Sequence, residues 1–528
     1  MQQKDKIYIK DWLALKPYNK HIGSDLYYLK ICNNIYNKLK EFEASTHPYL
    51  GKNDIKMLSC FITSYLEDII SGTNIWNSFV AFHQEIYGKK LPFFDVKEYY
   101  ENEPNIQDIN FLIWYFFNTV QQNKFILPQN ELFEKMSEEV IDILDEEYEY
   151  APENNELRKF YKISPDETDY YQVRLLMDAI FFKTYLLSID TDERLTKTEV
   201  DVFETYEDNP HLLINMLNEN RDTFLLNKHS RLLALKSKKW ASKIIGNVPV
   251  SQDIERISKK ISGFFLYKGQ DDNYIFLEHI ASGKRLDLTK KSFDHSKDLT
   301  KIDDVLLIGM AKWKNEWWFS GIFAKYDYDP EIVNRTKNSP EQKMDAQFLE
   351  DDYHEALELL QSQLESFKKF NNGSQIAFMP ANQVNDFIEK NLRFHNDIVH
   401  KKIKRKPDNP LLEKEKISVL DELEEANDEA LVFFNPKNGI EVALNINSAF
   451  PLPGNKFYRE ENHKEHLLRL LISDSFSTEL AKFSIDNCQN RLPFLQTAEG
   501  KAVLKDLDFF LRFWKKDIYH TIPHVTFI

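Results

Sequence analysis

The stretch that decides the fold is ISGFFLYKGQDDNYIFLEHIASGKRLDLT at residues 261–289, continued by DVLLIGMAKWKNEWWFSGIFAKY at 304–326. Turn residues separate its short apolar runs at Ala281–Gly283 and at Lys314–Glu316. Alternating runs between turns are typical of β-strands. We predict five strands, in GFFLYKG, NYIFLEH, RLDLT, DVLLIGMAKW and WWFSGIFAKY. Five strands in about 65 residues indicate a small barrel or strongly bent sheet of SH3-like or OB-like size.

The residues before this module predict helices. From Asp54 to Ile70 apolar residues recur at three- and four-residue spacing, and Asn53 or Asp54 can cap the helix start. Residues 109–120 are apolar nearly all round, which predicts a central buried helix. Further helices are predicted at 76–87, 131–148 and 175–187. The many acids of 131–148 are expected to face solvent.

The residues after the module return to helix and then mix helix with strand. An apolar stripe from Tyr353 to Phe367 predicts a helix, QIAFM at 375–379 a strand, and 381–399 another helix. ALVFFN and IEVALN are expected to form a hairpin around Pro436–Gly439. Helices are predicted at 463–473, 478–487 and 501–514.

The predicted fold class is therefore α+β and predominantly helical, with an N-terminal helical domain, a small central SH3/OB-like β-module and a C-terminal mixed α/β domain. A basic run, KKIKRK, and an acidic run, DELEEANDE, indicate a charged connector between the helical segment that ends at residue 400 and the α+β domain that begins at residue 431. The expected segments are a helical domain at 1–245, the β-module at 246–330, a helical segment at 331–400, a charged linker at 401–430 and an α+β domain at 431–528.

Composition excludes several classes of protein. The 528 residues carry 84 acids and 68 bases, a net charge of −16, which argues against a wholesale nucleic-acid coat but not against one basic patch. Only 14 residues are glycine, and the chain has no GxxxxGK[ST], GxGxxG or GxSxG motif. We therefore predict no cofactor, assign no catalytic residue and identify no small-molecule substrate.

Three cysteines without CxxC spacing favour reduced thiols and a cytoplasmic location. The polar N-terminus lacks the apolar core of a signal peptide, and no apolar run is long enough to span a bilayer, so no membrane partner is expected. Cys32 and Cys488 lie among apolar residues and are interpreted as small buried hydrophobes. In the pair Glu67–Asp68, one acid is expected to face the core and the other water, with a buried Asp68 bonding Trp76 or a backbone amide.

The basic tract is the first candidate binding site. Its members are Lys401, Lys402, Lys404, Arg405 and Lys406. Five bases that neutralise phosphates would give salt-sensitive affinity for nucleic acid or the ribosome. The favoured alternative is a solvated linker whose charge the following acids balance.

Aromatic rings of the β-module are a second candidate. Trp317 and Trp318 offer stacking faces of the kind that OB-folds use, although alternation requires half of the module's rings to lie in its core.

A histidine pair is the third and weakest candidate. His463 and His466 share one face of a predicted helix with Glu465 nearby. Zinc or iron needs two or three such ligands. However, HKEH is not HExxH, and the preceding PLPG favours a polar helix start at the surface.

Several stretches resemble an uncharacterised family of large cytoplasmic proteins from Bacteroidetes, a domain of unknown function. They are IYIKDWLALKPY at 7–18, SDLYYLKICN at 24–33, LEDIISG with IWNSFVAFHQEIYGKKLPFF within 66–94, FFNPKNGIEVALNINSAFPLPGN at 433–455 and DFFLRFWKKDIYHTIPHVTFI at 508–528. The resemblance runs the length of the chain and implies no activity. Separately, Ser282–Leu288, Asp304–Gly309 and Trp317–Gly321 are similar to a compact β-barrel module of some bacterial proteins, which implies a fold only.

Three functional hypotheses follow. The first is a non-enzymatic binding or adaptor protein that engages another macromolecule, with a protein as the expected partner. The second is a nucleic-acid- or ribosome-associated protein that uses residues 401–406. The third is a metal-dependent enzyme that uses the histidine pair.

Overall fold

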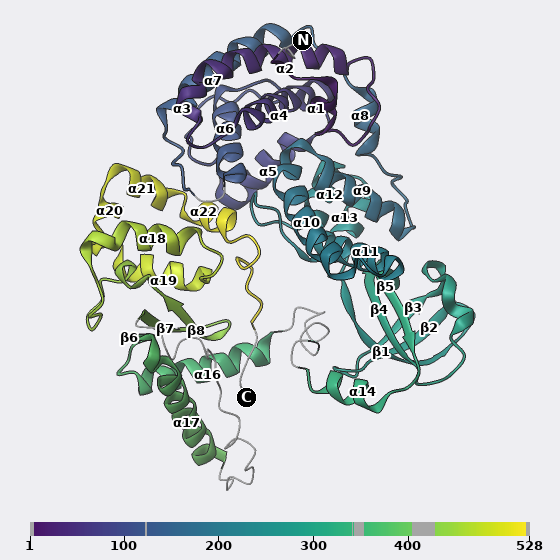
Figure 1. Cartoon of the computed structure of the whole chain (residues 1–528), viewed down its shortest axis with the longest axis vertical. Coiled ribbons are helices and arrows are strands. Elements are labelled where there is room, and N and C mark those ends of the chain that lie inside the picture. Colours follow the sequence, from purple (N-terminus) through teal and green to yellow (C-terminus); the bar gives the residue numbers. More distant parts are fainter. Residues whose placement is uncertain (1–4, 122–123, 340–341, 343–352, 404–427, 524–528) are drawn as a thin grey trace. The chain divides into compact units, whose positions relative to one another are not determined.

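The computed structural model describes residues 5–121, 124–339, 342, 353–403 and 428–523 (Figure 1). The chain forms two compact units, Met1–Glu350 and Asp351–Ile528. The fold is α+β and predominantly helical, as the sequence predicts, with a five-stranded and a three-stranded sheet in the described residues. The finer segment boundaries at 245, 330, 400 and 430 stay a prediction. Within the described ranges no helix has the length and apolar character needed to cross a membrane.

Helices precede the barrel in the first unit, and α14 follows it. They are α1 (Ile9–Leu13), α2 (Asp25–Leu39), α3 (Glu43–Thr46), α4 (Lys52–Ser71), α5 (Ile75–Tyr87), α6 (Ile106–Val120), α7 (Glu131–Tyr148), α8 (Asn155–Phe160), α9 (Tyr170–Lys183), α10 (Tyr185–Tyr206), α11 (Pro210–Asn227), α12 (Ser237–Ile244), α13 (Pro249–Glu255) and α14 (Pro330–Lys337). The predicted helices at 54–70, 76–87, 109–120 and 131–148 are confirmed as α4 to α7. All twelve residues from Asp108 to Thr119 of α6 are buried, which confirms it as a central helix.

In the first unit, two details of the helix predictions are wrong. The N-cap of α4 is Gly51, not Asn53 or Asp54, and the Asp54 carboxylate accepts the Gly51 N–H at 2.8 Å from inside the first turn. The segment 175–187 is not one helix, because the backbone at Thr184 is extended (ψ 140°) and separates α9 from α10. The Thr184 hydroxyl instead donates to the carbonyl of Ile180 at 2.7 Å.

The five predicted strands are all present. They are β1 (Ile261–Gln270), β2 (Tyr274–His279), β3 (Arg285–Thr289), β4 (Val305–Trp313) and β5 (Glu316–Tyr326). They form a closed barrel in the order β1-β2-β3-β5-β4. Every pair is antiparallel except β3 with β5, which is parallel and meets at one register pair, Leu288 and Trp317. This order is that of an OB-type barrel, one of the two alternatives that the sequence leaves open.

Helix α11 holds the barrel through the carboxylate of Glu219, which is 14% exposed. The side chain of Glu219 pairs with Lys260, accepts the Ser262 hydroxyl at 2.5 Å and accepts the Ile322 N–H at 2.9 Å. It enters the barrel wall over Gly321, where φ is +91° and a Cβ would overlap the Glu219 carboxylate. Glycine at this position therefore makes room for the helix and also adopts the positive φ within β5.

The second unit has three layers (Figure 1). Its elements are α16 (His354–Phe370), β6 (Ile376–Pro380), α17 (Val384–Ile403), β7 (Glu429–Asn435), β8 (Gly439–Leu444), α18 (His463–Ile472), α19 (Thr478–Cys488), α20 (Pro493–Gln496), α21 (Ala498–Lys505) and α22 (Leu507–Trp514). One face of the sheet packs on α16 and α17, and Phe433 on the other face contacts Phe483 of α19. The hairpin around Pro436–Gly439 is confirmed. The helix predicted at 501–514 is wrong as one piece, because it breaks at Asp506 between α21 and α22.

Candidate functional site

The second unit has an open sheet edge at β6. Its sheet runs β6-β7-β8, so β6 pairs with β7 on one side only. Along its other side lies a groove of about 600 Å³, which we call the β6 groove. Its walls are β6 itself, the first turns of α17 and the loop Leu452–Gly454. A groove beside a free strand edge is a site where another chain is able to pair.

The register of β6 decides which backbone groups face the groove. Phe434 donates its N–H to the carbonyl of Gln375 at 3.0 Å, and Ala381 donates to the carbonyl of Asp428 at 2.8 Å. Bonded and non-bonded pairs alternate along an antiparallel ladder. The odd-numbered residues of β6 therefore bond β7, and the even-numbered ones turn their N–H and C=O outward. Phe378, opposite Leu431, is the middle one of these.

Both ends of this edge are blocked. The carbonyl of Ile376 accepts the Asn371 amide at 2.9 Å and the Ser374 hydroxyl at 2.7 Å, and the Ile376 N–H donates to the Ser374 hydroxyl at 3.2 Å. Pro380 at the other end has no N–H to donate. In the part of the chain that the structure describes, nothing bonds the outward N–H or C=O of Phe378. The edge thus presents a single open donor–acceptor pair.

The side chains around this pair are apolar at the floor and neutral at the rim. The half-buried ring of Phe378 lies 6.2 Å from that of Phe450. Phe387 of α17 is also half-buried in the groove wall. On the rim, Asp386 and Lys390 pair with each other at 2.6 Å, so their charges cancel. The groove therefore suits an uncharged backbone with apolar side chains.

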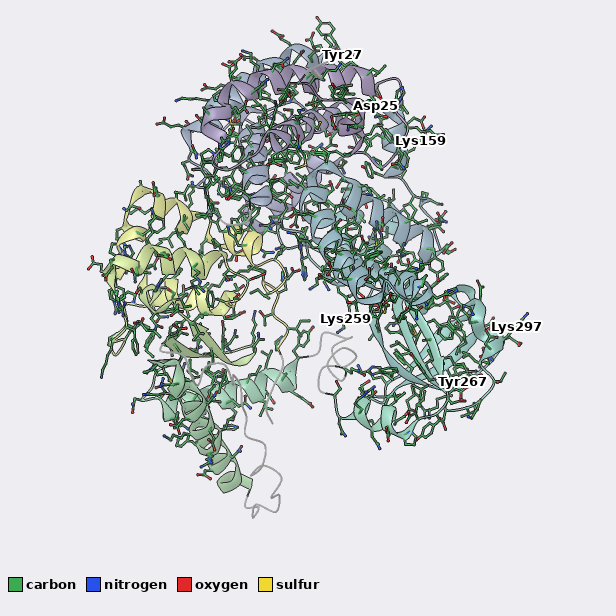
Figure 2. The ribbon with its side chains drawn as sticks, in the orientation of Figure 1. Asp25, Tyr27, Lys159, Lys259, Tyr267 and Lys297 are labelled. Atoms are coloured by element: carbon green, nitrogen blue, oxygen red, sulfur yellow. The ribbon has the colours of Figure 1, made fainter. Side chains whose placement is uncertain are left out.

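The first unit contains a buried polar network. Asp25, the first residue of α2 (Figure 2), accepts the Trp12 indole N–H at 2.8 Å and the Tyr18 hydroxyl at 2.9 Å. Lys16 pairs with Glu67, and its ammonium lies 3.7 Å from the centre of the Trp12 ring. These side chains satisfy one another and tie the N-terminal segment to α2 and α4.

Asp68 and Asp108 are further buried carboxyls of this network region. Asp68 accepts the backbone N–H of Trp76 at 2.7 Å, which confirms the predicted partner. Burial raises the pKa of Asp68, and its hydrogen bonds from Thr73 and the backbone oppose that rise. One oxygen of Asp108 accepts from Tyr65 at 2.7 Å and from the Trp76 indole at 3.0 Å, and burial raises the pKa of this carboxyl to about 7. Both carboxyls accept hydrogen bonds from groups in the core of the first unit.

The first unit is also where the comparison with known families gives a result. The family model described as "Protein of unknown function (DUF3843)" matches residues 6–278, which is just over half of the chain. The chain belongs to the DUF3843 family. The search of curated proteins and the search of solved structures found no match. The family match supports an uncharacterised domain-of-unknown-function family over residues 6–278, and it brings no activity with it.

The DUF3843 region holds one acid that the sequence analysis misplaced. Glu67 does not face water while Asp68 faces the core; both are buried. The reason is Lys16, which lies 51 positions earlier in the chain and supplies the opposite charge. A pattern of helical spacing carries no sign of such a distant partner, so Glu67 was assigned to the wrong environment.

The DUF3843 helices also cover one of the candidate tryptophans. Trp318 is 5% exposed and its ring lies 6.0 Å from Tyr170 and 6.1 Å from Tyr171 of α9. It is therefore a packing residue between barrel and helices and presents no outer stacking face. Trp317 is half-buried and packs against the barrel core.

Only the first part of the basic tract lies within the described residues. Lys401 and Lys402 belong to the last turn of α17. Lys404, Arg405 and Lys406 lie outside the described residues. A phosphate site on this tract stays a prediction.

The histidine pair bonds the backbone. The Nε2 atom of His463 accepts the Phe494 N–H at 3.0 Å, and Nδ1 of His466 accepts the Ser448 N–H at 3.1 Å. Burial lowers the pKa of His466. Among the described residues no three histidine, cysteine or acidic side chains gather in a way that would hold a metal ion. The two rings thus have structural bonds in the second unit, and the metal hypothesis stays a prediction for metal analysis to test.

The residue that sequence reasoning missed is Phe378. The strand QIAFM that contains it is predicted and confirmed as β6. Its place at the sheet edge depends on pairing with β7, about 55 residues later in the chain, which no local pattern encodes. The only local signals are Ser374 before the strand and Pro380 at its end, both typical of a protected edge.

Proposed function

We propose that this chain is a binding protein of the adaptor type, and that it takes up an extended segment of a partner protein in the β6 groove. The observation that carries the proposal is the unbonded outward N–H and C=O of Phe378, set in a groove between two blocked ends of the same edge. The complement of such a pair is another strand backbone, which adds to the sheet by β-augmentation.

The blocked ends define the segment that fits. With Ile376 already bonded and Pro380 without a donor, only one residue of β6 is open to a complete pair of hydrogen bonds. The partner segment is therefore short, and its side chains alternate between the face of the sheet that carries Phe387 and the face that carries Phe378. Apolar side chains are favoured there, because the rim pair Asp386 and Lys390 leaves no net charge.

The test uses a library of displayed extended peptides selected on the full chain. The decisive variant is Phe378→Pro, because this N–H makes no bond to β7 and its loss leaves the sheet intact. Selected peptides are expected to lose at least tenfold in affinity for Phe378→Pro and to retain it for the matched control Phe378→Leu. Far-UV circular dichroism checks that both variants fold. Peptides that bind Phe378→Pro as well as the parent chain would refute the groove as the site.

A second candidate function rests on the OB-type strand order. In such barrels the face of β2 and β3 binds oligonucleotides or oligosaccharides. Here that face carries the half-buried rings of Tyr274 and Phe276 beside the exposed Arg285. Binding of labelled single-stranded RNA or DNA that weakens with salt and with Phe276→Ala would support it. Binding that falls with salt but ignores Phe276→Ala would point instead to the basic tract.

A further inference from the structure

Two of the three cysteines lie in contact. Cys32 of α2 and Cys60 of α4 have their sulfur atoms 3.2 Å apart, and both are free thiols in the structure. Their side chains are buried, at 0% and 1% exposure. The helices that carry them pack against each other along the core of the first unit. The third cysteine, Cys488, belongs to α19 of the second unit.

We infer that Cys32 and Cys60 are a site of oxidative modification, at which a small hydroperoxide joins α2 to α4 by an intramolecular disulfide. A disulfide bond is about 2.05 Å long. The two sulfurs therefore need to approach by little more than 1 Å, about the size of an ordinary side-chain adjustment.

The chemistry balances with a hydroperoxide as the oxidant. One thiol loses its proton, and the thiolate sulfur attacks the outer peroxide oxygen. The O–O bond breaks, and the alcohol or water leaves with the proton, so that a sulfenic acid remains. The second thiol then attacks the sulfenic sulfur, the S–O bond breaks, water leaves and the S–S bond forms. Two electrons pass from the two sulfurs to the peroxide.

The surroundings of Cys32 and Cys60 determine which oxidants reach the thiols and how fast the first step is. Burial raises the pKa of the Cys32 thiol, and its contact with Cys60 adds to the rise, whereas Thr63 and the Lys16 ammonium oppose it. Because the thiolate is the reactive form, the first step is slow in the closed fold. Full burial also excludes large oxidants such as protein disulfides, which leaves small peroxides with access during local opening of the helices.

The consequence is a covalent loop of the chain between positions 32 and 60. Such a loop restricts the unfolded ensemble and so raises the stability of the fold. The oxidised protein is expected to unfold at a higher denaturant concentration than the reduced protein, and a dithiol reductant is expected to reverse the shift.

The experiment treats the full chain with hydrogen peroxide, alkylates the remaining thiols after denaturation and maps the peptides by mass. Two of the three thiols are expected to disappear. A linked pair of peptides containing Cys32 and Cys60 is expected, lighter by two hydrogen atoms than the sum of its parts. Cys32→Ser and Cys60→Ser are each expected to abolish the linked pair, and Cys488→Ser, the matched control, is expected to retain it.

Three results would overturn the inference. They are oxidation of Cys32 or Cys60 to sulfinic acid without linkage, linkage to Cys488, and a disulfide between two copies of the chain. If all three thiols persist, the peroxide treatment is repeated at a denaturant concentration just below the unfolding transition. There the helices open more often. Thiols that stay unlinked there as well would also refute the disulfide.

Discussion

The carboxylate of Glu219 on α11 fills the space that a side chain at Gly321 on β5 would need. Helix and barrel are fitted to each other at this point, because the carboxylate also accepts the N–H of Ile322, the residue next to that glycine. At this point the docking of the barrel onto α11 requires both the acid at position 219 and the absence of a side chain at position 321.

Gly321→Ala is expected to destabilise the first unit strongly. The new methyl group meets both a positive φ and the Glu219 carboxylate, and overpacking of this kind costs ~1–3 kcal/mol beyond the backbone strain of about 1 kcal/mol. Chemical denaturation measures the loss. Gly283→Ala is the control, since it shares a positive φ (+69°) but has nothing within 4 Å of the added carbon. Equal losses in the two variants would contradict a steric role for Glu219.

Lys260→Met is expected to cost more than the loss of an exposed ion pair. The Lys260 side chain is fully buried, and its removal leaves the carboxylate of Glu219 without its cation. Breaking a buried pair on one side typically costs ~3–5 kcal/mol. Lys239→Met, which breaks the half-exposed pair with Glu255, is expected to cost under ~1 kcal/mol. The free energies of unfolding of the two variants make the comparison, and similar values would show that the buried pair adds nothing.

Asp108 is expected to make the first unit less stable as pH rises from about 4 to about 7. Burial raises the pKa of this carboxyl from 3.8 to about 7, so over that range the folded chain holds a proton that the unfolded chain has released. The loss is up to ~4 kcal/mol at 1.36 kcal/mol per pKa unit. Unfolding free energies against pH are measured for the parent chain and for Asp108→Asn, which cannot ionise. Parallel curves for the two proteins would contradict the prediction.

Lys515→Met is expected to weaken the second unit. The buried Lys515 ammonium donates to the carbonyl of Phe476 at 2.7 Å and to that of Ser473 at the end of α18. Methionine fills the space but leaves two buried carbonyls without a donor, at ~1–3 kcal/mol for each unsatisfied group. Lys501→Met on the exposed side of α21 is the control and is expected to be neutral. If Lys515→Met leaves the free energy of unfolding unchanged, water has replaced the ammonium as the donor to the two carbonyls.

Local features of the fold followed from the sequence because local patterns encode them. Helical spacing located α4 to α7, and turn residues located every strand of the barrel. Thr184 was missed because its neighbours on both sides are helical and apolar, so the periodicity continues through the break. The buried partner of Asp68 was predictable because Trp76 lies only eight residues away.

Features that depend on contacts between residues far apart in the chain could not be predicted from the sequence. The sequence leaves open whether Trp318 faces solvent or the core, and the ring is buried because Tyr170 and Tyr171, nearly 150 positions earlier, pack on it. The open edge at Phe378 depends on the order of the three strands, which alternation alone cannot give. Sequence reasoning therefore found the strand of the candidate site but not the backbone groups that define it.

The closure of the barrel between β3 and β5 has a mechanical consequence. This seam is parallel and meets at the single pair Leu288 and Trp317, whereas the other four seams are long antiparallel ladders. On heating or under mechanical force, the pairing between β3 and β5 is expected to break first, and the barrel then opens into a curved sheet. Amide deuterium uptake is then expected to begin at Leu288, and β1, the strand farthest from this seam, is expected to exchange last.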